Sequence, residues 1–204
     1  RAFVAGEPHI KNPLFVEAHR LAIFNPRGTD VPVVLDLMVH DIDIILTIIK
    51  SPITRISASG VSIVSPTPDI ANARIEFENG AVANLTASRI SLKNMRKHRI
   101  FQKDAYITMD FLDKKTNIVR IHDVEGTPDP FAMTLDLADG TCKQITIEEL
   151  EINQINAIKS ELESFHDAIV NNTVPPVTIE DGVEVLKVAY LILNEMQSHQ
   201  PIIK

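Results

Sequence analysis

The chain has 204 residues and a formal net charge of −7, because 27 Asp and Glu outnumber 20 Lys and Arg. This length fits one large domain or two small ones, and so acidic a chain is a poor partner for nucleic acid, whose phosphates need concentrated positive charge. Hydrophobic residues make up 45% of the chain, and Cys142 is its single cysteine. That excludes an intrachain disulfide and fits a reducing, cytoplasmic compartment.

The chain opens with RAFVAGEPHI, which lacks the apolar core of a signal peptide. Because the first residue is Arg rather than Met, we expect a fragment or a processed product. PLFVEAHRLA (residues 13–22) predicts a strand. FNPRGTD (residues 24–30) predicts a loop, because Pro, Gly and short polar residues favour turns.

The next segment, VPVVLDLMVHDIDIILTIIK, predicts a helix that begins near Thr29 or Asp30 and ends at about Ile49, where KSP follows. Its apolar stretch approaches the length of a membrane span. However, ionisable residues near its centre would cost several kcal/mol each in lipid. We therefore expect no membrane partner.

The middle of the chain is rich in β-forming residues and turn signals. Asn79-Gly80 and Asp139-Gly140 are strong hairpin signals, because both dipeptides favour tight turns between strands. The predicted β segments are one strand at 53–65, a hairpin at 71–90, three strands within 96–125 and two strands within 131–147.

Two helices are predicted at the end of the chain. Residues 154–171 carry apolar side chains at helical spacing until TVPP breaks the pattern, and residues 178–197 begin with the capping box TIED. Hairpin-linked strands followed by helices predict an α+β fold, with a large, mostly antiparallel open sheet and helices on one face. We treat residues 1–204 as one domain.

The long predicted helix carries a polar stripe. Successive helical residues are about 100° apart, so Asp36, His40 and Asp43 share one narrow side, whereas Asp41 points roughly 140° away. Burying such groups costs free energy unless they are paired or face a wet cavity. Three interpretations stay open: a satisfied structural network, an acid/base pair lining a cleft, or a metal site, for which we see no convincing third ligand.

The pattern D-x-x-x-H-x-x-D, read as Asp36, His40 and Asp43, resembles that of the glucose–fructose oxidoreductase / inositol dehydrogenase / MocA family. The order of elements after about Pro13 and the tail P-x-T-x-E-D-G (residues 176–182) resemble the same family. The resemblance implies its C-terminal domain, which is of the glyceraldehyde-3-phosphate-dehydrogenase-like type. It also implies a sugar, cyclitol or nucleotide-sugar substrate, NAD or NADP as cofactor, and a homo-oligomer formed through the open sheet face.

The resemblance assigns roles to the stripe. His40 is implied to be the proton acceptor or donor at the reacting hydroxyl, with Asp36 as its catalytic partner at the substrate. Asp43 matches the trailing acid, which we group with the substrate-binding residues although its role is expected to be structural. Asn25 and Arg27, in the loop before the helix, are candidates for binding substrate phosphate or hydroxyls; a plain helix-entry loop is the other interpretation.

The chain departs from the family in one respect. Its seven glycines nowhere form G-x-G-x-x-G, and it lacks the Glu-Lys-Pro motif with the catalytic lysine. We therefore expect the cofactor to be bound mainly by an N-terminal Rossmann domain absent from this chain, which should be inactive alone. The resemblance also implies that the first sheet strand begins upstream, so residues 1–10 are expected to be a dangling or rearranged end. The alternative function is a non-catalytic β-sheet dimerisation or ligand-binding module with a structural Asp36–His40 pair.

Other polar residues are assigned from their surroundings. The basic segment SLKNMRKHR (residues 91–99) is interpreted as a solvated strand or loop, a docking surface for the missing domain, or a site for an anionic nucleotide-sugar tail. His19, Arg20 and Arg89 are unranked candidates for the cleft, and Cys142 is expected to be inert. The histidines expected to be surface residues are His9, His98, His122, His166 and His199.

Overall fold

The structure is a computed structural model that describes residues 2–124, 133–152 and 156–198. The strands are β1 (Phe15–Leu21), β2 (Ile53–Val61), β3 (Ile70–Phe77), β4 (Val82–Ser88), β5 (Met95–Phe101), β6 (Ala105–Asp110), β7 (Lys115–Asp123), β8 (Met133–Asp136) and β9 (Cys142–Leu150). The helices are α1 (Ala2–Gly6), η1 (Glu7–His9), η2 (Val34–Met38), α2 (Val39–Ile48), α3 (Ala157–Val170) and α4 (Ile179–Ser198).

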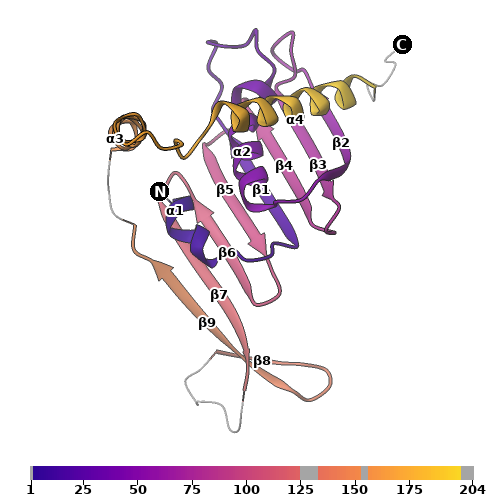
Figure 1. Ribbon diagram of the computed structural model, residues 1–204. Coiled ribbons are helices and arrows are strands. Elements are labelled where there is room, and N and C mark those ends of the chain that lie inside the picture. Colours follow the sequence, from indigo (N-terminus) through magenta and orange to yellow (C-terminus); the bar gives the residue numbers. More distant parts are fainter. Residues whose placement is uncertain (1, 125–132, 153–155, 199–204) are drawn as a thin grey trace, which may run out of the picture.

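The strands form one sheet in the order β2-β3-β4-β1-β5-β6-β7-β9-β8. Neighbouring strands run antiparallel except β1 and β4, which run parallel. Helices α1, α2 and α4 lie against one face of this sheet, and β7, β9 and β8 extend beyond them as an arm (Figure 1). The predicted α+β class, with a large and mostly antiparallel open sheet, is confirmed.

Alternation along the strands defines the face that the helices cover. In β3, Ala71, Ala73, Ile75 and Phe77 are buried, while the residues between them are more accessible. Side chains of a strand point alternately to opposite faces, so a strand of this pattern has one face packed and one open. The largest fully buried side chains of the core are Met38, Ile42 and Ile45 of the helix and Ile75, Leu85, Ile100, Ile107, Met109 and Ile118 of the sheet.

Both predicted hairpin turns are present. Gly80 and Gly140 each have φ of +82°, a left-handed conformation that glycine adopts without steric cost. The side-chain oxygens of Asn79 and Asp139 accept hydrogen bonds from the backbone amides two residues later, at 3.1 and 2.9 Å. These local contacts fix each turn, which is why the dipeptides could be recognised in the sequence.

The predicted long helix is not uniform. It begins as a π-helical turn, η2, in which the Val39 amide donates to the Val34 carbonyl, and it continues as α2. Pro32 lies just before this turn. Its carbonyl accepts hydrogen bonds from the amides of Leu35 and Asp36 at the start of the helix. Single π turns within helices are rare and are frequent at functional sites.

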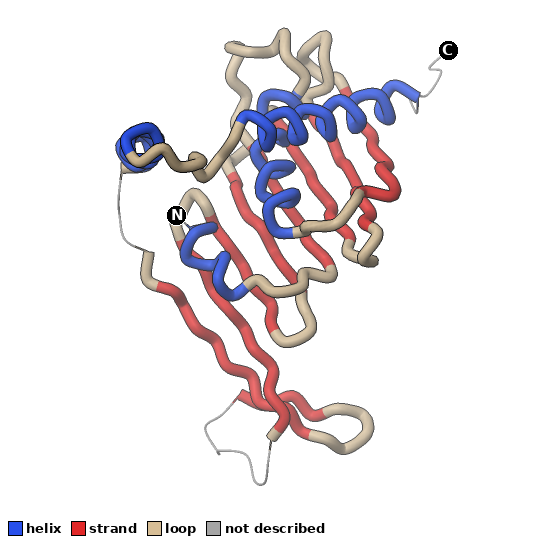
Figure 2. The backbone as a smooth tube through the Cα atoms, in the orientation of Figure 1, coloured by secondary structure: helices blue, strands red, loops and turns tan. Residues whose placement is uncertain are grey.

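The two C-terminal helices differ in their packing. Helix α4 lies across the sheet, and its predicted capping box is formed: the Asp181 carboxylate accepts from the Thr178 amide at 2.8 Å, and the Thr178 hydroxyl accepts from the Asp181 amide at 3.2 Å. Helix α3 lies beside the sheet instead of on it (Figure 2), so the helices on the covered face are α1, α2 and α4. The first predicted residues of its helix, 154 and 155, lie outside the described residues.

The start of the chain is not a dangling end. Residues 2–9 form α1 and η1, and Figure 1 shows α1 over the β6–β7 region of the sheet. Ala2 is 2% exposed, and its carbonyl accepts a hydrogen bond of 2.9 Å from the Thr116 hydroxyl. Ala2 and Gly6 are buried and Phe3 packs against the core, so these residues hold the segment on the sheet. No helix among the described residues is both long and apolar enough to span a membrane.

Candidate active site

The predicted polar stripe lies on the outer side of η2 and α2. Asp36 and His40 are exposed, and Asp43 is half-buried. No hydrogen-bond partner of the Asp36 or His40 side chain lies within the part of the chain that the structure describes. The structural Asp36–His40 pair of the alternative interpretation is therefore not formed there. Both side chains are open to a ligand.

Beneath the stripe, Asp41 turns toward the sheet, as its position on the helical wheel predicts. It is only 2% exposed. Arg20 of β1 holds it with two hydrogen bonds of 2.8 Å, from Nε to Oδ2 and from Nη2 to Oδ1. His98 of β5 contacts Oδ1 through Nε2, also at 2.8 Å. We call Arg20, Asp41 and His98 the anchor cluster, because they join two central strands to the helix that carries His40.

The anchor cluster is deeply buried and strongly coupled. Arg20 is 8% exposed and His98 is fully buried, with its ring edge-on to Phe111 at 5.0 Å between centroids. Burial alone would raise the pKa of Asp41, but the hydrogen bonds from His98 and Arg20 outweigh it and leave that pKa below its ordinary value. The carboxylate is therefore ionised and paired with Arg20 at neutral pH.

The surroundings of His40 favour its neutral form. Partial burial of the ring lowers its pKa below 6.5, the Arg20 guanidinium lowers it further, and the negative charge of Asp41 opposes them. Arg96 lowers the pKa and Asp43 raises it by smaller amounts. An imidazole of this kind is unprotonated at neutral pH, as a general base must be.

Asp43 lies toward a different opening. It lines a cleft of about 570 Å³ between α1, α2 and the start of α4, together with Asp181 and Glu184. Burial raises its pKa, and the negative charge of Asp181 raises it further. The predicted role of Asp43 in substrate binding stays a prediction.

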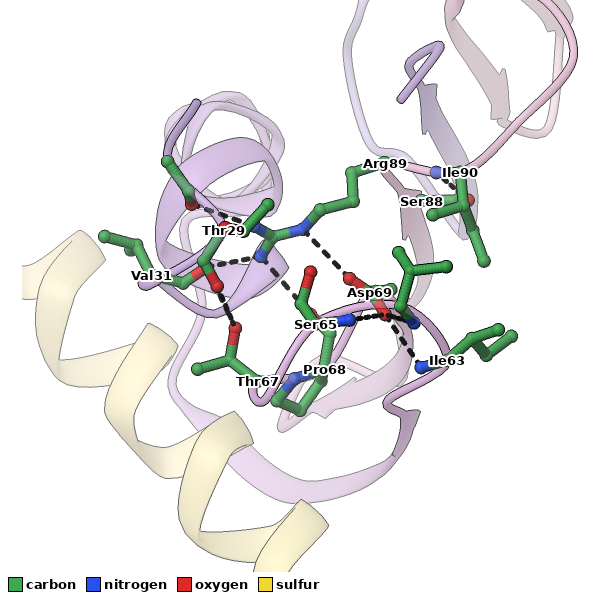
Figure 3. A network of polar contacts seen from close by, with 12 residues as sticks. Thr29, Val31, Ile63, Ser65, Thr67, Pro68, Asp69, Ser88, Arg89 and Ile90 are labelled. Carbon is green, nitrogen blue, oxygen red and sulfur yellow. Dashed lines mark hydrogen bonds and ion pairs between the residues drawn. The ribbon is translucent and has the colours of Figure 1, made fainter. Parts of the chain in front are cut away.

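The loop with Asn25 and Arg27 is held from below by a second buried ion pair. Arg89, 4% exposed, donates hydrogen bonds to the carbonyls of Gly28 and Val31 in this loop, and to that of Pro68 at 3.3 Å. Its partner Asp69 lies 3.7 Å from Nε (Figure 3). The sequence offered Arg89 as a candidate for lining the cleft. In the structure it is buried and supports this loop instead.

Asp69 ties down the neighbouring loop in the same way. Its Oδ2 accepts hydrogen bonds from the amides of Ile63, Val64 and Ser65 at 2.7, 2.8 and 3.0 Å (Figure 3). Burial acts against ionisation, but hydrogen bonds from the 63–65 segment outweigh it and lower the pKa of Asp69 to about 2. The Thr67 hydroxyl joins the two loops by donating to the carbonyls of Thr29 and Val31.

Asn25 and Arg27 are both exposed on the outer part of this loop. The Asn25 side-chain oxygen accepts a hydrogen bond of 3.0 Å from the Arg27 amide, which closes a local turn. The Arg27 guanidinium has no ion-pair partner among the residues that the structure describes. Their predicted contact with substrate stays a prediction.

Strand β5 divides the basic segment between the two faces of the sheet. Lys97 and Arg99 point to the open face, where they pair with Asp110 at 2.9 Å and with Glu17 at 2.7 Å. Arg96 pairs in register with Arg20 and so lies on the helix-bearing face, where it is exposed. The interpretation of this segment as a solvated strand fits Arg96, Lys97 and Arg99, which are exposed. It does not fit His98, which is buried.

The histidine predictions are partly wrong. His98 is fully buried instead of exposed, because Asp41 reaches it across the sheet–helix interface. His9 is half-buried against Arg120, with Nδ1 and Nη2 3.1 Å apart. His122 and His166 are exposed as predicted, and His199 lies outside the described residues.

Two further observations concern reactive groups. Cys142 is half-buried, and both burial and the neighbouring Asp136 raise the pKa of its thiol, as expected for an inert cysteine. Within residues 2–124, 133–152 and 156–198, no group of three or more His, Cys, Asp or Glu is arranged to hold a metal ion.

Sequence reasoning placed Asp36 and His40 on one side of the helix, but it gave no role to Asp41 and misplaced His98. A signal was available. A carboxylate on the apolar side of a helix needs a buried partner, and Arg20 alternates in step with the apolar Val16 and Ala18 of β1. What the sequence did not reveal is that β5 lies next to β1.

The structure thus combines an open, mostly antiparallel sheet with a helix that carries the D-x-x-x-H stripe. Residues 24–108 match the family described as "GFO/IDH/MocA C-terminal domain". The chain belongs to the GFO/IDH/MocA family, as its resemblance implied.

Named relatives support this assignment. The chain is 34% identical over 175 residues to UDP-N-acetylglucosamine 3-dehydrogenase of Acidithiobacillus ferrooxidans, covering 85% of this chain and 55% of that protein. A crystal form of that enzyme superposes with a TM-score of 0.79 at 29% identity, covering 94% of this chain and 56% of the other. The chain thus spans about half the length of this relative.

A more distant structure shares the fold alone. Levoglucosan dehydrogenase, solved in complex with NADH and L-sorbose, superposes with a TM-score of 0.73 at 14% identity, covering 95% of this chain and 59% of the other.

Proposed function

We propose that this chain is the substrate-binding and catalytic half of a cytoplasmic NAD(P)-dependent oxidoreductase acting on a nucleotide sugar. His40 takes the proton from the hydroxyl that is oxidised, or returns it in the reverse direction. The observation that carries this proposal is the pair of exposed side chains, Asp36 and His40, on the helix that matches the family motif. Both are free of hydrogen-bond partners among the described residues, and the surroundings of His40 hold its pKa below 6.5.

The residues of this chain suit substrate binding and proton transfer, but not the binding of a dinucleotide cofactor. None of the seven glycines lies in a G-x-G-x-x-G turn, so this chain offers no dinucleotide site of the Rossmann kind. We assign that site to an N-terminal Rossmann domain outside residues 1–204. A nicotinamide cofactor bound there would supply the hydride acceptor for the oxidation of the hydroxyl-bearing carbon.

The described residues of this chain then act on the proton and the substrate. Neutral His40 has a free ring nitrogen that can accept the hydroxyl proton, which leaves a carbonyl once the hydride has gone. Asp36, on the same side of the helix, can accept a hydrogen bond from a substrate hydroxyl and orient the sugar.

Two observations support a nucleotide sugar as substrate. The relative with 34% identity is named for UDP-N-acetylglucosamine. Arg96 is exposed on the helix-bearing face, near enough to lower the pKa of His40, and it has no ion-pair partner among the described residues. An unpaired guanidinium suits a diphosphate, which it can bind through two parallel hydrogen bonds.

The proposal includes self-association through the open face of the sheet. One apolar row crosses this face in register, with Phe101 and Tyr106 stacked at 4.6 Å and Phe15 edge-on to Phe101 at 6.0 Å between centroids. The row consists of Val82, Phe15, Phe101, Tyr106, Val119 and Ile147. Phe101 and Ile147 are exposed and the other four residues are half-buried. A continuous apolar row on a sheet face suits an interaction surface, and a second copy is the partner that the family resemblance implies.

The test uses a protein in which this chain is joined to its proposed dinucleotide-binding domain. Reduction of NAD and NADP is followed with UDP-sugars, cyclitols and free sugars. We expect turnover with a UDP-sugar, and a loss of roughly 10² to 10⁴-fold in His40→Ala. The free energy of unfolding should change little, because His40 is exposed and has no described hydrogen-bond partner.

His166→Ala is the matched control, since His166 is an exposed histidine on α3, away from the stripe. It should turn over normally. The alternative, a non-catalytic module, predicts the reverse pattern: no turnover in any form, and a stability loss of about 1–3 kcal/mol in His40→Ala. Normal activity of His40→Ala would refute the acid/base assignment.

A further inference from the structure

The anchor cluster is hard to explain by stability alone. Arg20, Asp41 and His98 lie between a helix and a sheet whose neighbouring contacts are apolar. Replacing a buried ion pair with well-packed apolar side chains is often neutral or even stabilising. A polar cluster in such a place therefore suggests a task that apolar packing does not perform, and the structure points to its neighbour in the chain, His40.

The geometry gives the cluster control over the orientation of the helix. Apolar contacts allow a helix to rotate and slide, whereas the two parallel hydrogen bonds from Arg20 fix the Asp41 carboxylate in one orientation. His98 fixes the same carboxylate from a second strand. Because Asp41 is held against the sheet, the adjacent His40 must face outward. The helix changes from the π turn η2 to regular α-helix at Val39, directly before His40.

We propose that Arg20, Asp41 and His98 are positioning residues that fix the place and the electrostatic surroundings of His40 for its proton transfer. The inference rests on the function proposed above. The cluster touches the sheet side of the helix, so it acts on the reaction only through His40.

The charges around His40 make this inference testable. Arg20 on β1 and Arg96 on β5 favour the neutral imidazole, while Asp41 and Asp43 on its own helix favour the charged form. Asp36 lies one turn earlier on the same side. Removing the Arg20 charge should therefore raise the pKa of His40, and removing the Asp41 charge should lower it. A general loosening of the fold would instead move both variants toward the ordinary value of 6.5.

The experiment is an NMR pH titration of the histidine ring protons of this chain, with the His40 signal assigned from its absence in His40→Gln. We expect the His40 midpoint to rise by about half a pH unit in Arg20→Met and to fall by a similar amount in Asp41→Asn. The control is Glu17→Gln, which breaks a 2.7 Å ion pair between the same two strands but on the open face. It should leave the midpoint unchanged.

Two conservative variants cover the case in which the first pair does not fold. Arg20→Lys keeps the charge but loses the forked geometry, and Asp41→Glu moves the carboxylate by one methylene. In the protein joined to its dinucleotide-binding domain, each should lower kcat about tenfold or more with little change in KM, because a small misplacement of a catalytic group costs turnover. Unchanged kcat in both would overturn the inference.

The outcomes also separate this inference from the proposed function. Midpoints that stay fixed, or that move in the same direction in Arg20→Met and Asp41→Asn, overturn the positioning role whatever the enzyme does. Suppose instead that the two His40 midpoints move apart, but the pH at which turnover falls on the acid side does not move with them. The anchor cluster would then still be coupled to His40. That result would reject His40 as the base and so refute the proposed function.

Discussion

Asp69 offers a quantitative test of how the loops around the site are held. Its Oδ2 accepts three backbone hydrogen bonds, and its pKa falls from an ordinary value of 3.8 to about 2. A pKa about 1.8 lower corresponds to roughly 2 kcal/mol of folding free energy, at 1.36 kcal/mol per unit. Asp69→Asn keeps the shape of the side chain and removes its charge. We therefore expect it to lose roughly 2 kcal/mol of stability at pH 7.

The contribution of Asp69 to the free energy of unfolding should depend on pH in one direction only. The folded chain binds the Asp69 proton more weakly than the unfolded chain does, so the contribution is complete above about pH 4 and is lost as the pH falls toward 2. Urea unfolding at pH 7 and pH 3 should give a difference between wild type and Asp69→Asn that shrinks by about half. Hydrogen exchange should also quicken at the amides of residues 63–65, which lose their charged acceptor.

Asp123→Asn is the matched control, because Asp123 pairs with Lys143 on an exposed strand and its side chain is 85% exposed. Its unfolding should not change measurably. The reasoning would be refuted if Asp69→Asn unfolded at the same urea concentration as wild type at pH 7, or if the difference persisted undiminished at pH 3.

Three further outcomes are expected. Leu85→Ala removes a fully buried side chain from the centre of the sheet and should cost about 2–5 kcal/mol in urea unfolding. Gly80→Ala has space for its methyl group but must adopt φ of +82°, so it should cost about 1 kcal/mol, whereas Gly182→Ala in α4 should not destabilise the chain. Phe101→Glu places a charge in the apolar row of the open face, and should reduce self-association in sedimentation experiments without altering the His40 titration; an unchanged molecular mass would argue against that face as the interface.

The elements that the sequence predicted well are those fixed by short-range chemistry. The hairpin turn at Asn79-Gly80 depends on a single glycine conformation, and the start of α4 depends on a capping box three residues long. The polar stripe is also local, since Asp36 and His40 lie one helical turn apart. Whether they are exposed was left open by the sequence; in the structure both are exposed, because the opposite side of the helix packs on the sheet.

The errors concern partners that are distant in the sequence. His98 was assigned to the surface because nothing within the chain around it suggests a partner, yet Asp41 reaches it from 57 residues away. Residues 1–10 were expected to be a dangling or rearranged end, whereas Thr116 holds Ala2 in place from 114 residues away. Helix α3 has the amphipathic pattern of a packed helix, but Phe165 and Leu162 remain 58% and 64% exposed.

By itself, the sequence determined the periodicities, the turns, the α+β class and the His40 stripe, because a residue and its near neighbours fix these through backbone geometry and local hydrogen bonds. Only the tertiary structure decided that β1 lies between β4 and β5, and hence that Arg20, Asp41 and His98 meet beneath the helix. That choice depends on how the strands are ordered in the sheet. Strand order is set by the summed packing of the whole core, which no local pattern contains.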